Sequence, residues 1–245
     1  MKTINPSELS PMQVQMILQT AVAPRPIALA STIDKNGNVN LSPFSFFNLF
    51  SSNPPILIFS PARRVRDNST KDTLHNVLEV PEVVIGNVNF DMVQQVSLSS
   101  TEYETGVDEF IKSGLTKKPA ELVKPPLIAE SPVNFECKVI EVKPLGNEGG
   151  AGNLVICEVL KIHIREEFLN EEGNLDQKKL DLVSRLGGNW YGRTSAETLF
   201  EVPKPLVTKG IGFDQLPSEI RNSKIFTGND LGMLANVEQL PEGNF

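Results

Sequence analysis

The segment 24–76 constrains the fold of this 245-residue chain more than any other part of it. Two apolar runs, Ile27–Ile33 and Val39–Phe47, flank a turn that contains Asn36-Gly37, a pair favoured in tight hairpins. A third strand-like run spans 55–60. Because short turns separate these runs, the segment predicts a meander of antiparallel strands.

A basic loop rich in hydroxyl groups, residues 63–73, follows the third run. The candidate ligands for an anion are three cations and three hydroxyl groups: Arg63, Arg64, Lys71, Ser60, Ser69 and Thr73. Thr73 and nearby N–H groups lie at a predicted helix start, where the helix dipole attracts negative charge. The loop therefore predicts a site for the phosphate of a planar cofactor. A solvated cluster of surface charges is the alternative interpretation.

Helices and long strands extend this meander. Apolar residues at helical spacing predict helices that begin at Pro11 and span 71–80 and 91–98. Further strand-like runs cover 83–88, 131–144 and 153–166. A strand rather than a helix follows the glycine-rich turn 146–152, so this turn predicts a hairpin and not a phosphate-binding loop. Strands at hairpin spacing with inserted helices predict a mostly β, antiparallel barrel.

Two segments lie outside this pattern. The composition shifts at Ala196, beyond which prolines interrupt short apolar patches. We expect one folded domain over 1–195 and an extended, irregular tail over 196–245, packed on the domain or on a partner subunit. The polar segment 101–118 suits an active-site flap or a dimer contact, with a solvated connector as the alternative.

Composition excludes several classes of protein. A net charge of −7 argues against general nucleic-acid binding, which needs a basic face. The chain has no run of 18 apolar residues and no apolar region at its N-terminus, so we expect a cytoplasmic protein without a membrane partner. Cys137 and Cys157 lie in strand-like runs without metal-ligand spacing, which predicts reduced core residues.

Side chains suited to catalysis are scarce. His75 and His163 belong to no metal or nucleophile motif, so we assign neither a metal ligand nor a catalytic residue. Such scarcity is expected when a bound cofactor performs the reaction and the protein orients it.

The order of the motifs resembles the flavin reductase-like family, whose members are FMN-binding split barrels. The resemblance covers about residues 15–195 and rests on five pieces: Arg25-Pro26-Ile27-Ala28, Asn40-Leu41-Ser42-Pro43-Phe44-Ser45-Phe46-Phe47-Asn48, Pro54-Pro55 with its strand, Lys71-Asp72-Thr73-Leu74-His75-Asn76, and Arg185-Leu186-Gly187-Gly188-Asn189. It implies an antiparallel split β-barrel with inserted helices and FMN as the cofactor.

The resemblance also implies which residues hold the cofactor. In the family, the strand end 42–48 runs along the isoalloxazine ring, and the loop 185–191 closes over the flavin or lines its open face. Strand alternation would send Phe44 and Phe46 to one face and Ser45 and Phe47 to the other, and ordinary core packing is the alternative role for the phenylalanines. For 185–191 the alternative is a turn with an aromatic anchor. The expected cofactor-binding residues are Arg25, Ser42, Phe44, Ser45, Phe46, Phe47, Asn48, Ser60, Arg63, Arg64, Lys71, Asp72, Thr73, Arg185 and Asn189.

The expected function is that of an FMN-containing oxidoreductase. NAD(P)H would pass hydride to the flavin N5, and the reduced flavin would reduce free flavin or another small acceptor, often for a partner monooxygenase. One alternative is a flavoredoxin-like FMN electron carrier reduced by a protein partner, and another is a non-catalytic barrel that has lost its cofactor. The resemblance further implies a homodimer with the cofactor near the two-fold interface.

Overall fold

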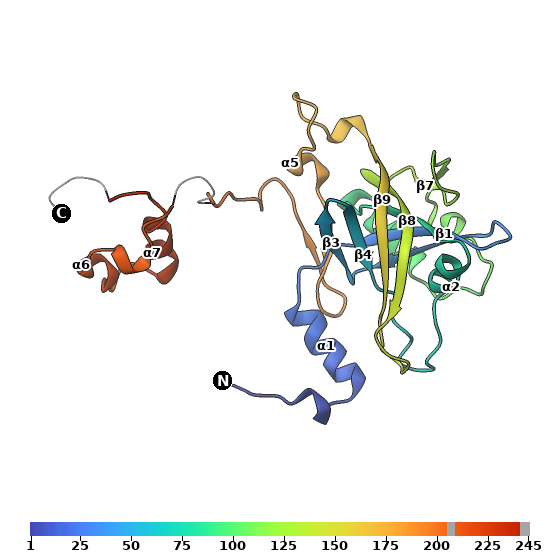
Figure 1. Ribbon diagram of the computed structural model, residues 1–245, viewed down its shortest axis with the longest axis horizontal. Coiled ribbons are helices and arrows are strands. Elements are labelled where there is room, and N and C mark those ends of the chain that lie inside the picture. Colours follow the sequence, from blue (N-terminus) through green and yellow to red (C-terminus); the bar gives the residue numbers. More distant parts are fainter. Residues whose placement is uncertain (205–208, 241–245) are drawn as a thin grey trace. The chain divides into compact units, whose positions relative to one another are not determined.

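The computed structural model describes residues 1–204 and 209–240, which belong to two compact units, Met1–Leu199 and Phe200–Phe245. The first unit is built on a seven-stranded antiparallel sheet with the strand order β2-β1-β5-β8-β9-β4-β3 (Figure 1). Its strands are β1 (Ala28–Ile33), β2 (Val39–Phe44), β3 (Phe47–Ser52), β4 (Pro55–Phe59), β5 (Glu82–Gly86), β8 (Val133–Pro144) and β9 (Asn153–Ile164). Two short hairpins accompany it, β6 (Lys117–Lys118) with β7 (Leu127–Ile128) and β10 (Val183–Arg185) with β11 (Tyr191–Arg193). The expected antiparallel architecture is confirmed.

The two edge strands of the sheet, β2 and β3, are consecutive in the sequence and separated by Ser45 and Phe46 alone. Three Cα–Cα steps of about 3.8 Å join Phe44 to Phe47, so these edges lie within about 11 Å of each other at this end. Within the described residues, β2 and β3 share no ladder hydrogen bonds. The sheet therefore wraps around its core without closing into a complete barrel.

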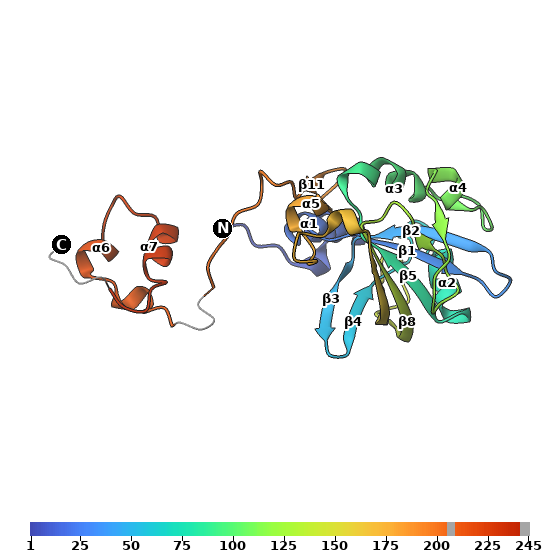
Figure 2. The same ribbon diagram turned by 90° about the horizontal axis from the view of Figure 1, so that it is seen from above.

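Helices cover both faces of the sheet (Figure 2). The helices of the first unit are α1 (Pro11–Ala21), α2 (Asp72–Glu79), α3 (Val93–Ser99), α4 (Glu109–Ser113) and α5 (Gln177–Leu180). Alternate residues of β1 point to opposite faces. Leu29 packs in one apolar cluster with Val96 of α3 and Phe110 of α4, whereas Ala28 packs in a second cluster with Val77 of α2. Burial of the first cluster holds α3 and α4 against one face of the sheet, and burial of the second holds α2 against the other.

The meander departs from the sequence-based expectation in the run Val39–Phe47, which does not form one strand. β2 ends at Phe44, Ser45 and Phe46 form a corner, and β3 begins at Phe47. The corner interrupts the alternation of side chains, so Phe44 and Phe47 pack in the same cluster while Phe46 stays 39% exposed. The expected grouping of Phe44 with Phe46 is therefore wrong.

The helix start predicted at Pro11 is confirmed, whereas α2 begins one residue and α3 two residues later than predicted. α1 follows Ser10, whose hydroxyl accepts the Gln13 N–H at 3.3 Å in a capping box. None of the residues of α1 is buried, although several are large and apolar. Among the helices of the described residues, none combines the length and apolar character that crossing a lipid bilayer requires.

The second unit contains two short helices, α6 (Ser218–Arg221) and α7 (Gly228–Leu234). Leu216, Leu231 and Ala235 form a small buried cluster between its elements. The region 196–245 is thus less irregular than its prolines suggested. The Thr227 side chain caps the start of α7. Residues 205–208 and 241–245 of the expected tail lie outside the described residues. Packing of the tail on the domain or on a partner stays a prediction.

Cys137 and Cys157 are free and fully buried in the cluster that includes Val77. Burial raises the pKa of the Cys137 thiol to about 12 and also raises the pKa of Cys157.

Both thiols should therefore resist a thiol-reactive reagent in the native protein and react only after unfolding. Replacement of either with Ala should lower the free energy of unfolding by about 1–2 kcal/mol. Rapid labelling of the folded protein would contradict this assignment.

Candidate functional site

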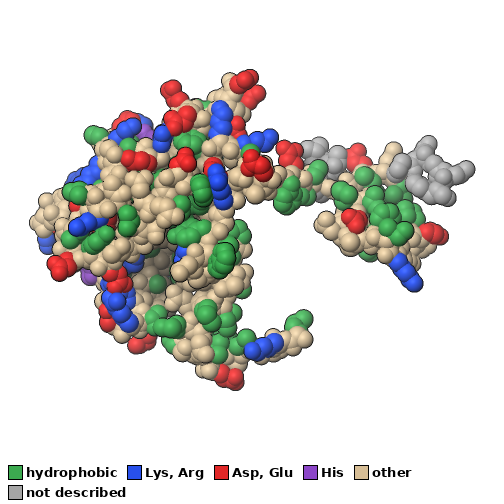
Figure 3. Space-filling view, turned by 180° about the vertical axis from the view of Figure 1, so that it is seen from behind, with side chains coloured by type: hydrophobic (Ala, Val, Ile, Leu, Met, Phe, Trp, Pro, Cys, Tyr) green, Lys and Arg blue, Asp and Glu red, His purple; other side chains and the backbone are tan. Residues whose placement is uncertain are grey.

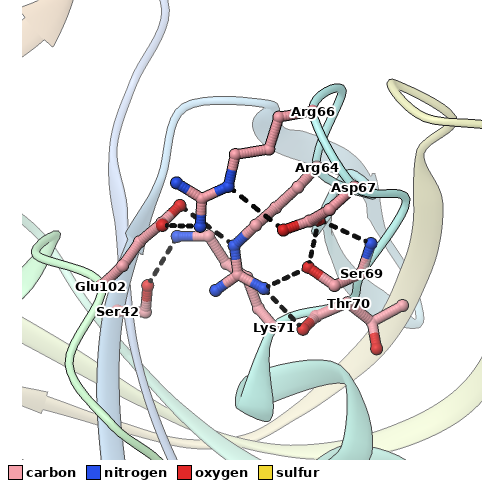
Figure 4. Close-up of polar contacts among 8 residues, drawn as sticks. All are labelled: Ser42, Arg64, Arg66, Asp67, Ser69, Thr70, Lys71 and Glu102. Carbon is pink, nitrogen blue, oxygen red and sulfur yellow. Dashed lines mark hydrogen bonds and ion pairs between the residues drawn. The ribbon is translucent and has the colours of Figure 1, made fainter.

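Three cations of the basic loop, Arg64, Arg66 and Lys71, point to the same side of the loop (Figure 4). Arg64 uses Nη1 to donate to the Ser69 hydroxyl and to the Thr70 carbonyl, both at 2.9 Å. These bonds fix the guanidinium against the loop that carries it. The side chain of Arg66, from the turn of the loop, and that of Lys71, from its end before α2, extend toward the same side of the loop. The arrangement concentrates positive charge, which suits an anion.

Lys71 links the loop to strand β2. It is the residue immediately before α2, and its Nζ donates to the Ser42 hydroxyl at 3.2 Å. The ammonium also lies 5.2 Å from the centre of the Phe44 ring. Burial, and secondly the Arg64 charge, lower the pKa of Lys71. An anion placed beside Lys71 would offset both effects, so this lysine favours a negatively charged ligand.

The loop is held in shape by its own polar side chains. Asp67 accepts the Ser69 N–H at 2.9 Å and its hydroxyl at 2.5 Å, and these bonds lead the causes that lower the Asp67 pKa to about 2. Arg63 donates through Nε to the Asn68 side chain at 2.6 Å and through Nη2 to the Asn68 carbonyl at 3.0 Å. Arg63 therefore stabilises the loop, while Arg64 and Lys71 offer charge to a ligand.

The glycine-rich turn between β8 and β9 supports the basic loop from outside. The Gly150 N–H donates to the Arg63 carbonyl at 2.9 Å. A Cβ added to Gly149 would lie 3.0 Å from the Arg64 carbonyl oxygen, so glycine permits this close backbone contact. The sequence correctly predicts a hairpin here, but it does not show that the hairpin touches the loop.

A cleft of about 690 Å³ opens between the basic loop and helix α1. Met12 and Leu18 of α1 and the exposed Phe46 give it apolar walls, and Arg64 and Arg66 give it a basic end. A ligand with an apolar body and an anionic terminus fits this combination. A flavin with a phosphate is such a ligand, so the residues present fit the cofactor that the resemblance implies.

A second cleft, of about 540 Å³, lies on the far side of the Ser45-Phe46 corner. It brings together three expected site residues, Ser45, Arg185 and Asn189. The Arg185 guanidinium lies 4.5 Å from the centre of the Tyr191 ring and donates to the Gly188 carbonyl at 2.8 Å. Of the expected residues, Phe46, Arg63 and Arg64 line the first cleft, and Ser45, Arg185 and Asn189 line the second.

Arg25 has a structural position. It is buried and donates to the carbonyls of Val22, at 2.6 Å, and Leu186, at 2.9 Å, and also to that of Gln19. Backbone hydrogen bonds join Arg25 to Arg185 in both directions. Arg25 thus ties the end of α1 to the loop 185–191, and its hydrogen bonds go to backbone carbonyls.

The other expected polar residues line neither of these two clefts. Thr73 is fully buried and accepts from the Asn40 side chain at 2.9 Å, which anchors α2 on β2. Asp72 accepts from the Thr105 hydroxyl at 3.4 Å. Asn48 is exposed on β3, and its side chain accepts the N–H of the next residue at 2.8 Å. Ser60 is buried, and its hydroxyl lies where a side chain at Gly152 would clash.

Sequence reasoning missed Glu102 and gave Arg66 no role. The Glu102 carboxylate accepts from Arg64 Nε at 3.0 Å and forms an ion pair with Arg66. The hydrogen bond from Arg64 is the largest cause of the lowered pKa of Glu102. The polar character of 101–118 was the available signal, but no pattern in it identifies a partner in another loop. In the described part of the chain, no group of three His, Cys, Asp or Glu is placed to hold a metal ion.

Comparison with solved structures identifies the architecture. Nitrilotriacetate monooxygenase component B from Bacillus cereus is 27% identical, with a TM-score of 0.75 over 83% of this chain and 98% of that chain. A protein of Shewanella frigidimarina described as a flavin reductase with a split barrel domain has a TM-score of 0.68 at 23% identity, over 81% of this chain and 95% of that chain. The expected split-barrel fold is confirmed, although the sheet here stays open.

Sequence comparison extends the same likeness. An uncharacterised protein of Halalkalibacterium halodurans is 38% identical over 84% of this chain and 98% of its own length. The family described as Flavin reductase like domain matches residues 21–181, which include the basic loop, the corner and the glycine-rich turn. This chain therefore belongs to the flavin reductase-like family of flavin-binding oxidoreductases.

Proposed function

We propose that this protein binds FMN and reduces flavin or another small acceptor with electrons from NAD(P)H. The observation that carries the proposal is the basic end that Arg64 and Arg66 give to an apolar cleft. The Lys71 side chain extends toward these two arginines. When bound, the flavin supplies the redox chemistry by accepting a hydride at N5 and passing the electrons on. The residues of the chain bind, orient and shield the cofactor.

Specific roles follow from the contacts. Arg64, Arg66 and Lys71 would hold the phosphate. The hydroxyl groups of Ser42 and Ser69 would be further donors, since they already bond Lys71 and Arg64. Phe46 and the apolar side of α1 would exclude water from the ring. Arg185, in the second cleft, is the candidate cation for a phosphate of the nicotinamide donor. The similarity to a monooxygenase component B supports a partner monooxygenase that would use the reduced acceptor.

The phosphate site is tested by comparing FMN with riboflavin, which lacks the phosphate. Lys71→Ala or Arg64→Ala should weaken FMN binding roughly 10- to 100-fold, because each removes a charge-assisted hydrogen bond. Riboflavin affinity should barely change. Lys118→Ala, which removes an exposed cation on β6, is the matched control. An FMN dissociation constant within twofold of the parent in both site variants would refute the assignment.

The electron donor is tested by anaerobic titration of the FMN-loaded protein with NADH and NADPH. We expect the visible flavin absorbance to bleach with one equivalent of the preferred nucleotide, because hydride transfer reduces the ring. Arg185→Ala should raise the nucleotide concentration needed and leave FMN binding unchanged. Persistent yellow colour with both nucleotides would instead favour an FMN electron carrier, and failure to bind FMN would favour a barrel without cofactor.

The homodimer is the second part of the proposal. Met12, Met16, Leu49 and Phe50 are each more than 60% exposed, although α1 and β3 belong to the folded first unit. Figure 3 shows hydrophobic side chains exposed on the lower part of the first unit, where α1 lies. Burial of such surface favours self-association. Light scattering at micromolar concentration should give about twice the chain mass of 26.9 kDa, and a monomer mass would contradict the expectation.

A further inference from the structure

Glu102 reaches the basic loop from a distant part of the chain (Figure 4). It follows α3, yet its two carboxylate oxygens contact Arg64 and Arg66, which precede it by 38 and 36 residues. One carboxylate thus bridges two of the three cations that converge at the site. Glu102 also lines the 690 Å³ cleft together with both arginines, so the bridge faces the space in which a ligand would lie.

The ion pairs of Glu102 with Arg64 and Arg66 lie at partly exposed positions, where they can separate. The side chain of Glu102 is 43% exposed, and those of Arg64 and Arg66 are 24% and 69% exposed. Ion pairs in such exposed positions contribute little to folding stability. A carboxylate that returns to water regains its hydration, so release of Glu102 costs the fold little.

Asp67, the other acidic residue near Arg64 and Arg66, is bound within the basic loop itself. Asp67 is bonded to both the N–H and the hydroxyl of Ser69, and it holds the turn in place. Glu102 has no such backbone attachment among the described contacts; its hydrogen bonds come from the two arginines. Of the two acids, Glu102 is the one that a ligand can displace.

We propose that Glu102 is an internal counter-ion that competes with the flavin phosphate for Arg64 and Arg66, and so sets how tightly the site holds FMN. The inference rests on the proposed phosphate site. A phosphate dianion and a carboxylate repel each other at the same two guanidinium groups, so binding of one displaces the other. Glu102 lowers the affinity for phosphate-bearing flavin selectively, which suits a flavin that exchanges with solution rather than a permanent prosthetic group.

The test is a titration of the full chain with FMN and with riboflavin. Glu102→Gln keeps the size of the side chain and removes its charge. FMN should bind about three- to tenfold more tightly, because two exposed ion pairs no longer compete with it. Riboflavin affinity should stay the same, since riboflavin carries no phosphate. The gain for FMN should shrink at high salt, where the charges are screened.

Glu104→Gln is the matched control. It removes the same charge from an exposed glutamate two residues away, so it alters the overall field without touching either arginine. Its FMN affinity should stay within about 1.5-fold of that of the parent, which is less than the change expected from the loss of an ion pair. Tightening by Glu104→Gln equal to that by Glu102→Gln would overturn the inference, because net charge alone would then explain the gain.

Lys71→Ala in the same titration separates the two proposals. Weaker FMN binding in Lys71→Ala together with tighter binding in Glu102→Gln supports both. Weaker binding in Lys71→Ala with unchanged or weaker binding in Glu102→Gln overturns the counter-ion role and leaves the phosphate site standing. Unchanged binding in both Lys71→Ala and Arg64→Ala removes the phosphate site and the inference with it. Equal tightening of FMN and riboflavin by Glu102→Gln would also overturn the inference.

Discussion

The two-residue connection between β2 and β3 is the constraint on which the rest of this structure depends. Because Ser45 and Phe46 alone join the two edges of the sheet, the edges must meet, and the sheet must wrap around its core. The chain then leaves β4, forms the basic loop and enters α2, which packs on β1 and β2. This path carries Lys71 to Ser42, which lies 29 positions earlier in the sequence.

Electrostatics at the site follow from that path. The loop brings its cations together only because Asp67, Asn68 and the backbone of the glycine-rich turn hold its shape. Burial, and secondly repulsion by the charge of Arg64, lower the pKa of Lys71, so its positive charge is unfavourable at this site. Glu102 relieves part of that repulsion within the protein, and a phosphate would relieve it from outside. The same imbalance therefore explains both the internal ion pair and the proposed ligand.

Much of the fold was predictable because its signals are local. The Asn36-Gly37 turn, the helix start at Pro11 and the glycine-rich hairpin each depend on neighbouring residues, and each lies where the sequence predicts it. The corner at Ser45-Phe46 was missed. The break itself, at Ser45 and Phe46, carries neither glycine nor proline. Only the pairing of β2 with β1 and of β3 with β4 shows where one strand ends and the next begins.

The sequence by itself determined the antiparallel strands, the helix starts, the buried cysteines and the basic, hydroxyl-rich character of residues 63–73. Tertiary structure decided which of those charged groups face a ligand. Arg63 turns inward to Asn68, Arg25 binds backbone carbonyls, and Glu102 joins Arg64 across 38 residues. The physical reason is that an arginine or a carboxylate has many partners of equal chemistry, and the packing of distant segments selects among them.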